Sequence, residues 1–372
     1  MDAGIGDWNP QGQPGANEPN PRKPAPGQRV VSLLPSITEI VCGVGGGLED
    51  QLVGVTHECD TPADVVARCE VVTTSGISPH TMSQAEIDRR VKGSLAMGHS
   101  LYGLDEAALL RADPTIVFTQ ALCDVCAPAF PMVLQRCVKV LGEDPRVISI
   151  EPQNVQDVID SVRLVGKETG FTDSAEAKAK QLEEGVFAVI CSCMLYFELL
   201  HAPVPPPPPS HPGPAGKGAC SVSVDVVAFL EWLEPLFNGG HWIPDMMEDA
   251  GANYSMVATG ERSAEIDPAS LSEYDPDMIL VAPCGFDQER AFKDAQRMWA
   301  HAWWKDLRAV REGQVYALDG NAYYARPGPR LLEGCGIIAR LVHGDEVCDR
   351  IGQDVCPRDE WARVTPPAPE SG

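Results

Sequence analysis

The sequence lacks the motifs of several large enzyme classes. It contains no G-x-S-x-G nucleophile elbow, no Walker phosphate loop and no H-E-x-x-H zinc-protease motif. The glycine-rich stretch at 43–47 follows a predicted helix, whereas a phosphate loop follows a strand, so we interpret it as a helix stop. With no acid/base or nucleophile constellation to support catalysis, the sequence predicts a binding protein and not an enzyme.

Basic residues and long apolar runs are also scarce. The 372 residues include 29 Lys and Arg against 53 Asp and Glu, for a formal net charge of −24. That field repels phosphate backbones and anionic lipids, so nucleic acid and membrane surfaces are not expected partners. No apolar run reaches the ~18–20 residues of a membrane span. The nearest one, 186–200, is too short and contains Glu198.

Two further features predict a cytoplasmic location. Residues 1–28 have no apolar core of a secretory signal and read as a disordered tail rich in Pro, Gly and Asn. The 13 cysteines are odd in number and widely scattered, which fits a reducing compartment better than a disulfide framework.

From Arg29 onward, strand patterns alternate with helix patterns. "RVVSLLP" and "TIVFTQ" are short β-branched runs, and "VQDVIDSVRLVGKETG" has helical periodicity. This alternation predicts an α/β fold of two lobes, with mostly parallel sheets, joined by a long helix. The expected parts are a tail at 1–28, an N-terminal lobe at 29–150, a linking helical segment at 151–186, a proline-rich low-complexity insertion at 187–218, a C-terminal lobe at 219–345 and a tail at 346–372.

The candidate site comes from the loops that follow the predicted strands, because ligands of open α/β sheets bind beyond the carboxyl ends of the strands. These loops are rich in Cys, His and aromatic residues. They are "PSITE" (35–39), "HECDTP" (57–62), "ALCDVC" (121–126), "LEPLFNGGHW" (233–242), "PCGFD" (283–287) and "GNAYYARPGP" (320–329). If the two lobes face each other, all six loops converge on one ligand site.

Cysteines at the strand ends leave a second hypothesis open. Cys123 and Cys126 form a C-x-x-C pair, which can be a redox dithiol, half of a metal site or part of a ligand pocket. A lone cysteine is as often a small core residue. The alternative function is a zinc or iron site, or a thiol redox centre, built from Cys59, Cys123, Cys126 and Cys284 with His57 nearby.

Six motifs, in order, resemble the class III periplasmic substrate-binding proteins of cobalamin and iron-siderophore ABC transporters. They are "RVVSLLPSITEIVCGVG", "LVGVTHECDTPADV", "SLYGLDEAALLRADPTIVFTQALCDVCA", "FLEWLEPLFNGGHWIPDMMEDAG", "VAPCGFDQER" and "VYALDGNAYYARPGPRLLEG". The resemblance covers roughly 29–343 apart from 187–218, and is strongest to a branch labelled cobalamin-binding protein. It implies two α/β lobes bridged by one long helix, with a corrinoid held flat between them and a transporter-like partner.

Carried over by position, the resemblance also implies site residues. Pro35 and Ser36 would border the ligand, Phe237 would pack against its ring, Tyr323 would supply a second aromatic and Arg326 a charged contact. His57, Glu58 and Trp242 come from the same loops and complete the predicted ligand set. The expected ligand is a small molecule, cobalamin or a related corrinoid, since a wide slot with aromatic walls suits a large flat ring.

Overall fold

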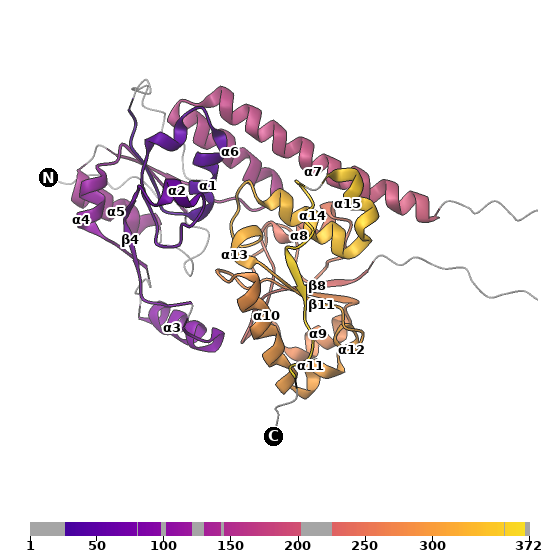
Figure 1. Cartoon of the computed structure of the whole chain (residues 1–372). Helices are drawn as coiled ribbons and strands as arrows, with labels where there is room; N and C mark the ends of the chain where they lie inside the picture. The colour runs from indigo at the N-terminus through magenta and orange to yellow at the C-terminus, as the bar shows by residue number, and fades with distance from the viewer. Residues whose placement is uncertain are drawn as a thin grey trace, which may run out of the picture.

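The computed structural model describes residues 27–79, 81–97, 102–120, 130–142, 145–201, 225–352 and 354–368. Two α/β lobes lie side by side and one long helix runs across both (Figure 1). The prediction of an α/β fold with two lobes joined by a long helix is confirmed.

Lobe 1 is built on a parallel sheet with strand order β3-β2-β1-β6-β7. Its central strands are short β-branched runs buried on both faces, as covered parallel strands require. The strands are β1 Val30–Ser32, β2 Leu52–Val55, β3 Glu70–Val71, β6 Ile116–Thr119 and β7 Arg146–Ser149; β4 Thr73–Ser75 and β5 Tyr102–Leu104 form a separate antiparallel pair. The helices are α1 Pro35–Val44, η1 Leu48–Gln51, α2 Ala63–Val66, α3 Gln84–Ala96, α4 Glu106–Ala112 and α5 Phe130–Leu141.

Helix α1 begins without a side-chain cap. Its first residue is Pro35, and the preceding Leu34 offers no side-chain cap. Proline suits this position because its fixed φ matches the helix and its missing N–H would have no helical partner there. The helix therefore starts directly after the loop that leaves β1.

Lobe 2 has the strand order β12-β11-β10-β8-β9, with parallel central strands and antiparallel edges. The strands are β8 Val227–Leu233, β9 Leu236–Asn238, β10 Met278–Val281, β11 Val315–Leu318 and β12 Trp361–Arg363. The helices are α8 Ile243–Asp249, α9 Pro268–Tyr274, α10 Gln288–Arg297, η2 Met298–Ala300, α11 Ala302–Asp306, α12 Arg308–Arg311, α13 Gly320–Tyr323, α14 Leu331–His343 and α15 Asp345–Ile351.

The segment expected to be a C-terminal tail contributes to lobe 2. Residues 346–372 contain most of α15 and all of β12, which pairs with β11 at the sheet edge. A disulfide joins Cys348 to Cys356 and closes the turn between these elements. The sequence offered little sign of this, because β12 has only three residues and only partly buried or exposed side chains.

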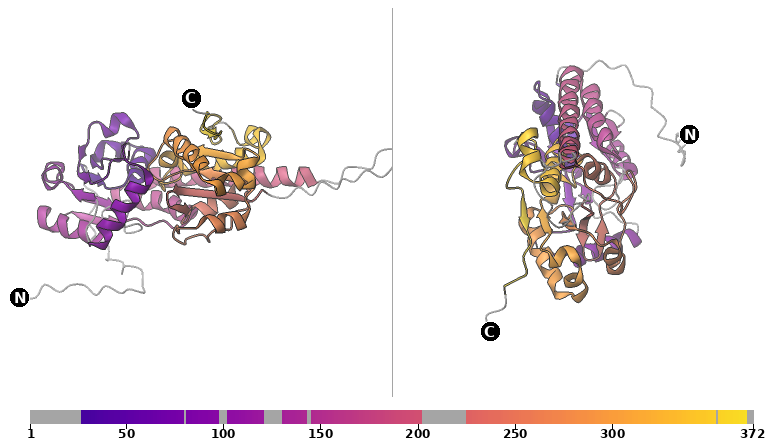
Figure 2. Two further views of the ribbon diagram at one scale, coloured as in Figure 1. Left: turned by 90° about the horizontal axis from the view of Figure 1, so that it is seen from below. Right: turned by 90° about the vertical axis from the view of Figure 1, so that its right-hand side faces the viewer.

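Helices α6 (Val155–Thr169) and α7 (Thr172–His201) connect the lobes and lie alongside each other (Figures 1 and 2). They approach closely at Gly166, where an added Cβ would lie 2.0 Å from the Cβ of Ala175. Helix α7 packs on α1 of lobe 1 and on α8, α14 and α15 of lobe 2. One apolar core therefore continues through α7 from lobe 1 into lobe 2.

The linking helix is longer than the predicted segment 151–186, because α7 continues to His201. The rest of the predicted insertion, 202–218, lies outside the described residues. Among the helices that the structure describes, none is long and apolar enough to cross a membrane.

Candidate functional site

Three of the selected loops, 35–39, 57–62 and 320–329, meet between the lobes, and an ion-pair network joins them. The guanidinium of Arg326 in lobe 2 donates to Glu39 Oε1 at 3.0 Å and to both carboxylate oxygens of Asp60 at 2.6 and 2.9 Å. It also donates to the Glu58 carbonyl and to the Asn321 side chain. We call Glu39, Asp60, Asn321, Arg326 and Arg330 the arginine bridge.

The central ion pair of the arginine bridge is buried. The side chains of Arg326 and Glu39 are each 5% exposed, and Arg330 donates to both oxygens of Glu39 at 2.9 and 2.6 Å. Burial of Asp60 alone would raise its pKa, but the hydrogen bonds and charge of Arg326 outweigh this effect and lower it. Buried ions need such mutual pairing because each loses its hydration, so the bridge holds the lobes together on this side.

A row of aromatic side chains lies on the lobe 2 surface that faces lobe 1. Trp232 and Phe237 are cross-strand partners on β8 and β9, so their side chains share one face of the sheet. The Trp232 ring lies 5.3 Å from that of Phe286, which follows β10. We call Phe237, Trp232 and Phe286 the aromatic row. Ile87 and Val91 of lobe 1 pack in one apolar cluster with Phe286 and Trp232.

The predicted site residues of lobe 1 lie at the same interface. Ser36 is buried against lobe 2, where a Cβ added at Gly328 would meet its backbone at 3.4 Å, and Pro35 beside it is half-buried. His57 Nδ1 lies 2.7 Å from Thr73 Oγ1, and its Nε2 lies 3.2 Å from Glu58 Oε1. The His57 side chain is therefore held in place by polar contacts within lobe 1.

Two predicted aromatic contacts occupy other surroundings. Trp242 is 7% exposed and donates from Nε1 to the Tyr324 carbonyl at 2.9 Å, so it is part of the core. Its position gives no support to a ligand contact. Tyr323 lies with its ring 5.8 Å from the guanidinium of Arg330. Burial and the acceptor carboxylate of Glu360 raise the pKa of its phenol.

The cysteines do not assemble a metal site in the part of the chain that the structure describes. Cys59 is buried with Thr38 and Thr56 hydroxyls 3.2 and 3.3 Å from its sulfur, and burial raises the pKa of its thiol. A thiol held in the neutral form is a poor metal ligand. No group of three His, Cys, Asp or Glu suited to a metal occurs among the described residues. Cys284 is half-buried after β10, and Cys123 and Cys126 lie outside the described residues.

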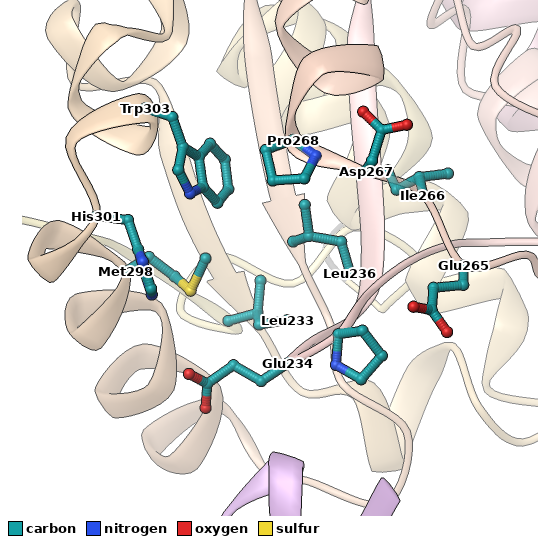
Figure 3. Close-up of a pocket in the computed structure, with 11 residues that line it drawn as sticks. Leu233, Glu234, Leu236, Glu265, Ile266, Asp267, Pro268, Met298, His301 and Trp303 are labelled. Atoms are coloured by element: carbon teal, nitrogen blue, oxygen red, sulfur yellow. The ribbon is translucent and has the colours of Figure 1, made fainter.

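A separate pocket of about 540 Å³ opens on lobe 2 beside the β8–β9 turn (Figure 3). Leu233, Leu236 and Met298 supply apolar side chains, and Trp303 faces Pro268 across it. Glu265 on one side pairs with Lys92 of lobe 1 at 3.0 Å. The six predicted ligand-contacting loops contribute only residues 233–236 to this pocket, which is therefore distinct from the inter-lobe region.

Sequence reasoning missed most of the residues that join the lobes. Glu39, Asp60 and Phe286 lie within the loops it selected, but no pattern marked them. Trp232 lies one residue before the selected loop and reads as an ordinary strand residue. The available signal for the bridge was an acidic residue in the apolar helix α1, Glu39, together with an arginine in a Gly/Pro-rich loop, Arg326.

Comparison with solved structures defines the class of protein as the two-lobed periplasmic-binding-protein fold. A periplasmic heme binding protein from Pseudomonas aeruginosa matches with a TM-score of 0.59 at 18% identity, over 85% of this chain and 92% of the other. The periplasmic vitamin B12 binding protein of Vibrio cholerae matches with a TM-score of 0.54 at 16% identity, over 88% and 97%. An ABC transporter substrate-binding protein from Listeria monocytogenes matches with a TM-score of 0.58 at 15% identity, over 85% and 99%.

A family model matches part of the chain by sequence. Residues 223–322, within lobe 2, match the family described as periplasmic binding protein. No curated protein is significantly similar to the chain. The matched family and the structural neighbours are substrate-binding proteins, which agrees with the prediction of a non-enzymatic chain. The cobalamin-binding branch is not distinguished, because the neighbours are named for both heme and vitamin B12.

The predicted cytoplasmic location is wrong. The matched family and the neighbouring structures are periplasmic solute-binding proteins. The disulfide between Cys348 and Cys356 is also a feature of oxidising compartments, where the expectation from the scattered cysteines was a reducing one.

Proposed function

We propose that this protein binds a corrinoid or a similar planar metal chelate between its two lobes, without chemical turnover. The observation that carries the proposal is the aromatic row on the face of lobe 2 that is directed toward lobe 1. Flat aromatic faces suit a large ring with apolar surfaces, because stacking combines apolar burial with defined geometry.

Three further features support this ligand class. The ion pairs of the arginine bridge hold the facing loops at a set separation, and preorganisation lowers the cost of binding. The imidazole of His57 lies 3.2 Å from the carboxylate of Glu58, whose carbonyl accepts from Arg326, and imidazole is a common ligand of cobalt and iron. The solved neighbours named for vitamin B12 and for heme share this fold.

The test is a titration of the purified chain with cyanocobalamin, hydroxocobalamin and hemin, followed by visible absorption and calorimetry. If Phe237 stacks on the ring, Phe237→Ala should weaken binding by about 1–3 kcal/mol, which is roughly 5- to 150-fold in Kd. The matched control is Phe187→Ala, which removes a 66% exposed phenylalanine on α7. Absence of heat and of a spectral change with all three compounds at high micromolar concentration would rule out the proposal.

A further inference from the structure

A segment of lobe 1 reaches across to lobe 2 on a surface separate from the arginine bridge. It consists of residues 76–79 and 81–83 and helix α3, and we call it the arm. The arm is held to lobe 1 by β4, which pairs with β5. Figure 1 shows α3 lying apart from the main body of lobe 1, on the side facing α10.

The polar contacts of the arm are centred on Gln84, which is 1% exposed. Its Nε2 donates to Asp294 Oδ2 at 3.0 Å, and its Oε1 accepts from the Leu233 amide at 2.7 Å. Arg290 of lobe 2 donates to the carbonyls of Pro79 and Met82 at 2.9 and 2.8 Å. In each of these bonds one partner belongs to the arm and the other to lobe 2, so the bonds exist only while the arm is docked.

The apolar contacts of the arm are also made with lobe 2. Ile87 and Val91 pack in a cluster with Phe286, and the partly buried members are Ile77, Met82 and Trp232. Within the described chain this cluster contains residues of the arm and of lobe 2, and none from the lobe 1 sheet. The buried face of a lobe 1 helix is thus covered by lobe 2, at the Trp232–Phe286 end of the aromatic row.

Release of the arm would leave the buried charge of lobe 2 paired, and would separate only the exposed Lys92–Glu265 pair. Asp294 is 5% exposed, yet it also accepts from Arg290 Nε at 2.9 Å and from Arg297 Nη1 at 2.8 Å, both within α10. Because Gln84 is neutral, its release leaves no buried charge without a partner. The arginine bridge differs, because Glu39 would lose buried cationic partners if the lobes parted there.

We propose that the arm is a detachable clamp, and that the lobes part at the arm while α7 and the arginine bridge stay joined. Docked, the arm covers Trp232 and Phe286; released, it exposes this end of the aromatic row to an entering planar solute. Its role in solute entry rests on the proposed function, whereas the detachment itself does not.

Hydrogen exchange of the ligand-free chain tests detachment. We expect the amides of α3 to exchange at least about tenfold faster than those of α14, through an opening that does not unfold the protein. The double variant Gln84→Ala/Ile87→Ala should speed α3 exchange about tenfold again and lower the midpoint of thermal unfolding by only a few degrees. The control Gln156→Ala, an exposed α6 glutamine with two surface hydrogen bonds, should change neither.

Stopped-flow binding of cyanocobalamin then tests the role in entry. In the double variant the association and dissociation rates should both rise at least about threefold, with a smaller change in Kd, as expected when a closed state is destabilised. Equal protection of α3 and α14 in the wild-type chain would overturn detachment. Faster α3 exchange with unchanged binding rates would overturn the role in entry. A chain that binds none of the solutes contradicts the proposed function, and the exchange result still decides detachment.

Discussion

The arginine bridge and the arm both join lobe 1 to lobe 2, but they use different chemistry. The bridge places a buried guanidinium between two carboxylates, while the arm places a neutral amide and a small apolar cluster on lobe 2. Removing one partner of a buried ion pair costs about 3–5 kcal/mol. A neutral hydrogen bond contributes only about 0.5–1.5 kcal/mol.

The comparison teaches which contact can open under ordinary thermal fluctuation. Opening at the bridge must either expose several charges to water together or leave the carboxylate of Glu39 buried without its arginine partners. Opening at the arm exchanges the bonds of Gln84 and the bonds from Arg290 to backbone carbonyls for bonds to water, and it separates the exposed Lys92–Glu265 pair. Asp294 keeps its two arginines. The position of charge, more than the number of contacts, therefore distinguishes the fixed side from the openable side.

The largest expected effect comes from breaking the bridge. Arg326→Ala should lower the free energy of unfolding by about 3 kcal/mol, the lower end of the range for a broken buried pair, because Arg330 still neutralises part of Glu39. Urea denaturation at pH 7 measures this loss. The control Arg358→Ala removes an exposed ion pair with Asp349 and should cost less than about 1 kcal/mol. Equal small losses in the two variants would contradict the assignment of the bridge.

An acid titration sharpens the comparison. Because the folded-state pKa of Asp60 is lowered, its contribution is present above the unfolded pKa of about 3.9 and is lost as pH falls through the folded value. Asp60→Asn should therefore destabilise the chain at pH 7, by no more than about 1 kcal/mol since Asp60 is half-exposed and screened. The deficit relative to wild type should shrink below pH 4. Asp306→Asn, at an exposed position of α11, is the control, and a deficit that grows in acid would be inconsistent with this pairing.

The smallest effect is expected at the surface of the arm. Lys92 pairs with Asp88 and with Glu265 across the lobes, but its side chain is 53% exposed. Lys92→Ala should change the free energy of unfolding by less than about 0.5 kcal/mol, and the change should diminish further in 0.5 M salt. Urea denaturation at two salt concentrations measures it. A loss above about 1 kcal/mol would show that charge, and not Gln84 with its apolar cluster, holds the arm.

The predicted site shows where sequence reasoning stopped. Three of the selected loops, 35–39, 57–62 and 320–329, contact each other between the lobes, at the edge that strand direction in a parallel sheet predicts. Individual roles were harder to predict. Arg326 was expected to contact a ligand, yet it pairs with Glu39, 287 positions earlier in the chain. Trp242 was expected to contact a ligand, yet it is packed in the core.

The sequence by itself determined the α/β class, the order of the elements and the two lobes, because hydrophobic periodicity and turn residues act locally and leave a readable pattern. Only the tertiary structure decided which charges meet across the lobes and which helix of lobe 1 packs on lobe 2. Those contacts join residues as far as 287 positions apart. Their energies depend on burial and on mutual distance, which a local pattern does not contain. The tertiary structure also decided that residues 361–363 form an edge strand, since a three-residue segment pairs only where a neighbouring strand offers free backbone groups.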